Sequence, residues 1–299
     1  MRSNRTSHCL FAMVPIILWV ILLSIASSTQ AQIPLASPSP TPQPAATPSL
    51  EKQFFKNVLH DQKAIWTSPF HLQARDGRWL APLGLGTAAL IATDRETGDE
   101  IGESHRQLNA SRIVSYAGSS YSVASAAAAF YIFGRAKHDE RARETGVLGA
   151  EALVDSTIVV TALKEITQRR RPTAAKGRSD FFDGGSSFPS GHSIEAWSLA
   201  TVIANEYHES RLIQISAYGI ASAVSVARFT GRNHYLSDVL VGSAMGYGIG
   251  RYVYHAHHRK RSASGDEEES SERPRGWPLI APQYCRALRE YGVAVAWSF

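Results

Sequence analysis

The chain has 299 residues, enough for one sizeable domain with tails, and 19% of them are charged, below the ~25% of an average soluble domain. Its net charge of +5 is spread out, with no basic run longer than three residues, which argues against a nucleic-acid partner and favours an anionic small substrate or a membrane surface. Two cysteines, Cys9 and Cys285, leave the fold independent of an internal disulfide, because Cys9 lies in a segment expected to be removed.

The N-terminal segment, residues 1–31, is predicted to be a signal peptide. Arg2 and Arg5 precede an apolar run from Leu10 to Ile25, and small polar residues follow it. An uncleaved membrane anchor is the alternative, because the apolar run is almost long enough to span a bilayer. Residues 32–50 are rich in proline, serine and threonine, which indicates an extended linker. We therefore expect an exported protein, periplasmic or associated with the cell envelope.

The segment 51–258 predicts a single all-α domain. Leu50–Trp66 is amphipathic, and about six apolar core helices follow it, near 79–93, 112–134, 147–168, 193–208, 211–228 and 236–256. Charged residues inside most of these segments favour a water-soluble bundle. A membrane-embedded version of the same architecture stays open, because residues 113–134 are long and uncharged.

The C-terminal part changes character twice. Residues 259–276 mix both charge signs with serine, glycine and proline, which is typical of a solvated linker. Residues 277–299 form a strand-like tail, because Tyr291, Val293 and Val295 alternate with small residues. We expect a terminal strand or hairpin that docks on the domain or a partner, since so short a tail cannot close a membrane barrel.

The first motif with chemical significance is Lys164, six residues, then Arg171-Pro172. Seven residues are two helical turns, so both cations are expected on one face of a helix that Pro172 ends. They could bind an anion, or they could be a solvated helix end. For Arg169 and Arg170 we expect the solvated role.

The second motif is Pro189-Ser190-Gly191-His192, at the start of an apolar helical run. A helix start exposes unpaired N–H groups that bind phosphate oxygens. Ser190 is a natural N-cap, Gly191 lets a ligand approach the backbone, and His192 lies in the first turn.

The third motif is Arg228, five residues, His234, three residues, Asp238. Two antiparallel helices over 193–208 and 211–228 should return Arg228 to the vicinity of His192. His234 is expected to open the next helix, with Asp238 on the same face and hydrogen-bonded to its ring. Cations, amides and two histidines together fit phosphoryl transfer, in which one histidine attacks and the other protonates the leaving oxygen. We expect no metal or other cofactor.

The three motifs together resemble the signature of the type 2 phosphatidic acid phosphatase (PAP2) and vanadium haloperoxidase superfamily. This resemblance implies a metal-independent phosphatase with His234 as the nucleophile, Asp238 orienting it and His192 as the general acid. It also implies a set of phosphate ligands: Lys164, Arg171, Ser190, Gly191 and Arg228. One departure is Ala227, where the family usually has serine.

Two other functions stay open from the sequence. A vanadate-dependent haloperoxidase would use the same pocket, and a non-enzymatic envelope protein would need no pocket. The substrate expected for the phosphatase is a phosphorylated lipid or a small phosphate ester. The sequence leaves open which of these it is, and also the oligomeric state.

Overall fold

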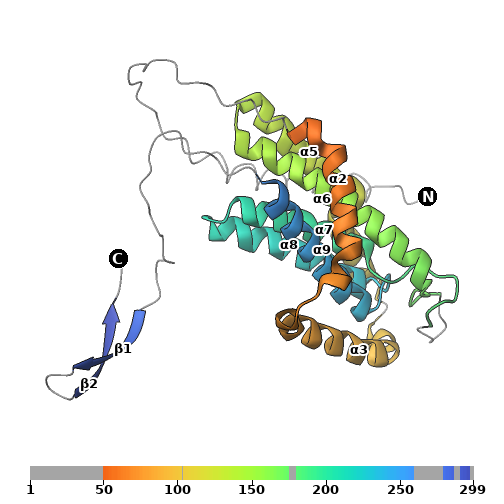
Figure 1. The fold of residues 1–299 in the computed structure, drawn as a ribbon. Coiled ribbons are helices and arrows are strands. Elements are labelled where there is room, and N and C mark those ends of the chain that lie inside the picture. The colour runs from red at the N-terminus through yellow and green to blue at the C-terminus, as the bar shows by residue number, and fades with distance from the viewer. Residues whose placement is uncertain (1–49, 103, 175–179, 259–278, 286–289, 297–299) are drawn as a thin grey trace. The chain divides into compact units, whose positions relative to one another are not determined.

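The computed structural model describes residues 50–102, 104–174, 180–258, 279–285 and 290–296 (Figure 1). The chain divides into two units after His258. The predictions for residues 1–31, nearly all of 32–50 and 259–276 concern residues outside the described part.

The first unit is helical wherever the structure describes secondary structure, which confirms the all-α prediction. Two short 3-10 helices, η1 and η2, join its first two long helices. The elements are α2 (Leu50–Thr67), η1 (Ser68–His71), η2 (Ala74–Asp76), α3 (Gly77–Glu100), α4 (His105–Ala117), α5 (Ser120–Lys137), α6 (Glu140–Thr167), α7 (Gly191–Glu206), α8 (Arg211–Thr230) and α9 (Leu236–His257).

The second unit contains a β-hairpin. Strands β1 (Leu279–Cys285) and β2 (Glu290–Ala296) pair in antiparallel orientation, with Leu279 opposite Ala296. Tyr291, Val293 and Val295, which alternate with small residues in the sequence, lie on β2. A strand-like tail is therefore present, in the form of a hairpin.

The predicted helix over 112–134 was wrong, because the chain forms α4 and α5 there. Gly118 lies at the break, and a methyl group in place of its hydrogen would lie 2.1 Å from Cγ1 of Val224 on α8. Ser119 then caps α5, accepting a hydrogen bond from the N–H of Ser122 at 3.3 Å. The close approach at Gly118 and the cap at Ser119 interrupt what the apolar composition alone predicts as one helix.

The core is built around α7, which is buried along most of its length. One apolar cluster packs α7 against α5 and α8 through residues such as Phe130, Leu199 and Val224. A second cluster packs it against α6 and α9 through residues such as Leu148 and Ile194. Because both clusters share α7, the start of α7 lies between the C-terminal end of α6 and the start of α9.

A stripe of glycines lets α9 approach α7 closely. A methyl group at Gly246 would lie 2.3 Å from the carbonyl oxygen of Ile194, and Gly242 and Gly250 face α7 in the same way. The three glycines are spaced by four residues, so they lie along one side of α9. This contact brings the first turn of α9 against the first turn of α7.

Two described helices, α6 and α8, are long and apolar enough to cross a membrane by length and composition. The apolar window of α6 is 61% buried, as in the core helix of a soluble bundle. Large apolar side chains are nevertheless exposed on the first helices of the unit, among them Phe55, Leu59, Phe70, Trp79 and Leu85. Others are exposed on α4, α5, α6 and α8, and scattered exposed apolar residues are normal.

Candidate active site

The first cationic motif departs from its predicted geometry. α6 ends at Thr167, and Gln168 stops it with a φ of 44°, in the left-handed region. Lys164 lies in the last helical turn, whereas Arg171 lies beyond the helix. The prediction that one helix face carries both cations was therefore wrong, as was the prediction that Pro172 ends the helix.

The loop before the second motif turns back onto the end of α6. The N–H of Phe182 donates to the carbonyl of Thr167 at 2.8 Å, and the N–H of Ser187 donates to that of Arg169 at 2.8 Å. Such bonds satisfy carbonyl groups that a helix end leaves unpaired. They end α6 before the proline and place Ser187 beside the site.

The second motif begins α7 as predicted, although Ser190 does not cap it with its side chain. Its hydroxyl instead accepts a hydrogen bond from Ser193 at 3.1 Å, and its N–H donates to the carbonyl of Asp238 at 3.0 Å. A methyl group at Gly191 would lie 3.3 Å from Nζ of Lys164. The helix start, the lysine and the third motif therefore lie side by side.

The third motif brings His234 and Asp238 together in a way that differs from the prediction. His234 precedes α9 instead of opening it, and Asp238 lies in its first turn, where it accepts a hydrogen bond from the N–H of Tyr235 at 3.0 Å. The Nδ1 atom of His234 lies 2.7 Å from the carbonyl oxygen of Ser187 and 3.6 Å from Oδ2 of Asp238. The ring is therefore hydrogen-bonded to the backbone, with the carboxylate as a close charged neighbour.

This contact determines which ring nitrogen of His234 carries the hydrogen. A carbonyl oxygen only accepts hydrogen bonds, so Nδ1 must be the donor and Nε2 keeps its lone pair. Burial lowers the pKa of His234 more than the nearby Asp238 raises it, so the ring is neutral at neutral pH. The arrangement offers a neutral imidazole with a free Nε2.

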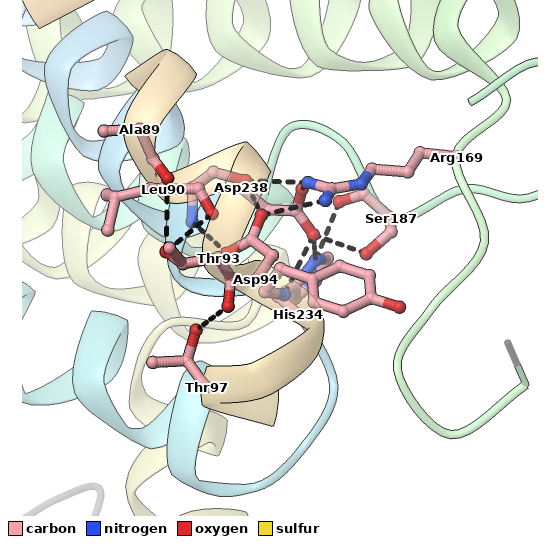
Figure 2. Close-up of polar contacts among 11 residues, drawn as sticks. Ala89, Leu90, Thr93, Asp94, Thr97, Arg169, Ser187, His234 and Asp238 are labelled. Atoms are coloured by element: carbon pink, nitrogen blue, oxygen red, sulfur yellow. Dashed lines mark hydrogen bonds and ion pairs between the residues drawn. The ribbon is translucent and has the colours of Figure 1, made fainter. Parts of the chain in front are cut away.

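Arg169 is a residue whose role the sequence analysis missed. It was expected to be solvated, but it is completely buried and forms ion pairs with Asp238 at 2.5 Å and with Asp94 of α3 at 2.8 Å (Figure 2). Arg170, also expected to be solvated, is exposed and pairs with Asp183. The run of three arginines contains no signal that separates the two.

Four predicted site residues, Lys164, Arg171, Arg228 and His192, lie close enough to disfavour one another's positive charge. Burial and then Arg171 lower the pKa of Lys164, and the same two causes lower that of Arg228 to about 10. Burial and then Arg228 lower the pKa of His192 to about 3. Every one of these shifts would be relieved by a bound anion.

One cluster in the described residues has ligand atoms placed to hold a metal ion. Glu144, Glu206 and His258 offer ligand atoms within 4.8 Å of one another. They lie at the ends of α6, α7 and α9 that are remote from the site, roughly 24 Å away along α7 at 1.5 Å per residue. Nδ1 of His258 lies 3.1 Å from Glu144 and 3.2 Å from Glu206, so the three side chains also contact one another directly.

The part of the chain that carries the three motifs is similar to known proteins. Residues 145–262 match the PAP2 superfamily, and this range includes all three motifs. Over this range the chain resembles the PAP2 superfamily. The structure also resembles the first transmembrane PAP2-type phosphatidylglycerolphosphate phosphatase from Bacillus subtilis, with a TM-score of 0.44, 21% identity, and coverage of 69% of this chain and 94% of that one.

A curated relative matches a short part of the chain. It is a lipid A 1-phosphatase from Porphyromonas gingivalis, 36% identical over 69 residues, which are 23% of this chain. The match spans 16% of the length of that relative.

Proposed function

We propose that the chain is a phosphatase that hydrolyses a phosphate monoester or lipid phosphate through a phosphohistidine on His234, without a metal ion. The hydrogen bond from Nδ1 of His234 to the carbonyl of Ser187 carries this proposal. It leaves Nε2 as a nucleophile in a site surrounded by cations. The match of residues 145–262 to the PAP2 superfamily supports the same reaction class.

The phosphate would be held by charge and by the start of α7. Lys164, Arg171 and Arg228 match the negative charge spread over a transferring phosphoryl group. The N–H groups of the first turn of α7, beginning at Gly191, have no partners within the helix and bind anions. The Ser190 hydroxyl accepts from Ser193 and so retains its own hydrogen to donate.

The reaction has two displacements at phosphorus. In the first, Nε2 of His234 forms the P–N bond while the P–O bond to the leaving group breaks, and His192 gives its proton to the leaving oxygen. In the second, water attacks the phosphohistidine, His192 takes up a proton from the water, and the P–N bond breaks to release inorganic phosphate. Asp238 stabilises the positive charge that His234 carries between the two steps.

His192 must gain its proton together with the substrate. Its pKa of about 3 in the structure arises from burial and from the surrounding cations. A bound phosphate group neutralises those cations and raises the pKa of the imidazole. Substrate binding therefore leads to protonation of His192, which makes it the general acid. The proton comes either from solvent or from the monoanionic phosphate group itself.

We further propose that the substrate is lipid-linked and that the protein works at the cell envelope. The curated relative is a lipid A 1-phosphatase, which supports a lipid phosphate. Large exposed side chains such as Phe70, Trp79 and Leu85 support contact with a lipid surface. Fractionation with and without high salt or detergent tests this association, and a wholly soluble protein would contradict it.

The direct test is hydrolysis of a lipid phosphate and of p-nitrophenyl phosphate by the full chain in the presence of a chelator. We expect turnover that the His234→Ala substitution abolishes and that the exposed His208→Ala control leaves within about twofold of wild type. Vanadate should inhibit. Activation of halide oxidation by vanadate would instead identify a haloperoxidase, and absence of any turnover would favour a non-enzymatic role.

A further inference from the structure

We propose that Arg169 and Asp94 are positioning residues for the candidate active site. Arg169 holds the carboxylate of Asp238 beside His234, and Asp94 of α3 holds Arg169. The proposal rests on the phosphatase function above and extends it to residues outside the three motifs.

The guanidinium of Arg169 binds two carboxylates, those of Asp238 and Asp94, through two different nitrogens (Figure 2). Nη1 donates to Oδ1 of Asp238 at 2.5 Å and to the Ser237 hydroxyl at 2.7 Å, and Nη2 donates to Oδ2 of Asp94 at 2.8 Å. Asp94 also accepts hydrogen bonds from the N–H and the hydroxyl of Ser237. The planar fork therefore links α3 to the first turn of α9, a geometry that lysine cannot reproduce.

The surroundings of Arg169 leave it little freedom. Its side chain is fully buried, with the guanidinium carbon 4.6 Å from the ring centroid of Phe181 and 4.3 Å from that of Tyr235. The two aromatic rings add cation–π contacts. Since a buried ion pair adds little net stability relative to apolar packing, its value here lies in the geometry it imposes.

That geometry determines how Asp238 faces the histidine. Arg169 occupies Oδ1, while Oδ2 accepts from the Ser187 hydroxyl and the N–H of Tyr235 and lies 3.6 Å from Nδ1 of His234. With both oxygens bonded, the carboxylate cannot rotate away. Ser187 is shared, because its carbonyl accepts from His234 while its hydroxyl donates to Asp238.

The charges are also matched to the reaction. Although burial opposes ionisation, His234 and then Arg169 hold the pKa of Asp238 below its ordinary value. Asp94 balances Arg169, so the three charges sum to −1 beside His234. That negative charge is what a positively charged phosphohistidine needs. Without Asp94, Arg169 would neutralise Asp238.

The test compares adjacent arginines. Arg169→Ala is expected to lower kcat by about 100-fold, which is the loss typical of a misplaced reacting group. KM should change less than about threefold, because Arg169 does not contact the phosphate. Arg170→Ala, which removes an exposed ion pair with Asp183, should stay within about twofold. Arg169→Lys keeps the charge without the fork and should remain at least about tenfold impaired.

Asp94 is tested by a double-mutant cycle. Asp94→Asn should lower kcat about tenfold alone and have no further effect in the Arg169→Ala background, because it acts only through Arg169. Glu96→Gln, an exposed change on the same helix, is the control. If the two losses multiply, or if Arg169→Ala stays within about threefold of wild type, the positioning role is wrong.

A readout without turnover separates this proposal from the phosphatase function. Histidine ¹⁵N spectra should show His234 as the Nδ1–H tautomer in the wild type and the Arg170→Ala variant. They should show a mixture in Arg169→Ala or, should that variant not fold, in Asp94→Asn, because a displaced Asp238 carboxylate no longer holds the Ser187 hydroxyl and, with it, the carbonyl that selects the tautomer. An unchanged tautomer in the folded variants contradicts positioning whether or not the protein is active. Loss of the tautomer preference without any phosphatase activity in the wild type contradicts only the proposed function.

Discussion

The Nδ1 atom of His234 is hydrogen-bonded to the backbone carbonyl of Ser187 at 2.7 Å, with Asp238 a further neighbour at 3.6 Å. The carbonyl alone therefore selects the tautomer, and the carboxylate supplies charge. In serine-protease triads, loss of the aspartate charge selects the wrong tautomer and lowers kcat by about 10⁴-fold. Here we expect Asp238→Asn to lower kcat by only about 10²-fold, while histidine ¹⁵N spectra still show the Nδ1–H form, because the amide oxygen of asparagine can still accept from the Ser187 hydroxyl and keep its carbonyl in place. A tautomer switch in this variant would contradict the assignment to Ser187.

The role of His192 as general acid predicts a dependence on the leaving group. His192→Ala should lower kcat by about 10²–10⁴-fold for an alkyl phosphate, whose alkoxide needs a proton, and far less for p-nitrophenyl phosphate, whose leaving group needs none. Steady-state kinetics with both substrates measure the difference. The exposed His208→Ala serves as the control. Equal losses for both esters would mean that His192 binds phosphate without transferring a proton.

A buried acidic cluster remote from the site makes stability depend on pH. Glu151 and Asp155 of α6 are fully buried, and each has one carboxyl oxygen without a hydrogen-bond partner among the described residues. Burial raises the pKa of each group to about 7. Between roughly pH 4.5 and 7, the folded chain holds protons that the unfolded chain releases, so stability falls as the pH rises through this window.

Replacing Glu151 with glutamine removes the charge that is costly to bury and keeps the acceptor for Asn57, which donates at 2.9 Å. At pH 8 the variant should unfold about 2–4 °C above wild type, the shift expected for ~1 kcal/mol in a chain of this size. At pH 4 both forms are neutral and the difference should vanish. Thermal unfolding followed by circular dichroism measures the difference in unfolding temperature. A variant that is equally destabilised at both pH values would contradict the prediction.

The glycine stripe of α9 allows a matched steric test. Gly246→Ala would push a methyl group to 2.3 Å from the carbonyl of Ile194, whereas at Gly248 on the same helix no atom lies within 4 Å. We expect Gly246→Ala to lower the free energy of unfolding by about 1–3 kcal/mol and Gly248→Ala to leave it unchanged or raise it by up to ~1 kcal/mol. Denaturant unfolding compares them, and equal stability of the two variants would rule out close packing at the stripe.

The sequence predicts two local features of the candidate site, the start of α7 at the second motif and the α7–α8 pair. Both depend on periodicity, turn residues and helix starts, which act over a few residues. The extent of α6 was misjudged because Gln168 adopts a left-handed conformation, stabilised by a loop that returns from residues 180–188. Proline at 172 gave a plausible but wrong helix end.

Long-range partners explain the remaining differences. Arg169 is buried because of Asp94 and Asp238, which lie 75 and 69 residues away, and the run of arginines contains no trace of this. His257 at the end of α9 is a second case, because it pairs with Asp61 at 2.8 Å, 196 residues away. Such pairs depend on which helix faces meet, which local patterns do not contain.

The most direct test of the central claim is to trap the covalent intermediate. Brief reaction with ³²P-labelled substrate followed by quenching in alkali should leave label on one peptide, the one that contains His234, because a P–N bond survives alkali and is lost in acid. The label should be absent from His234→Ala and present, with slower release, in His192→Ala, which lacks the group that activates water. Turnover without any labelled His234, or label stable to acid on another residue, would contradict the mechanism.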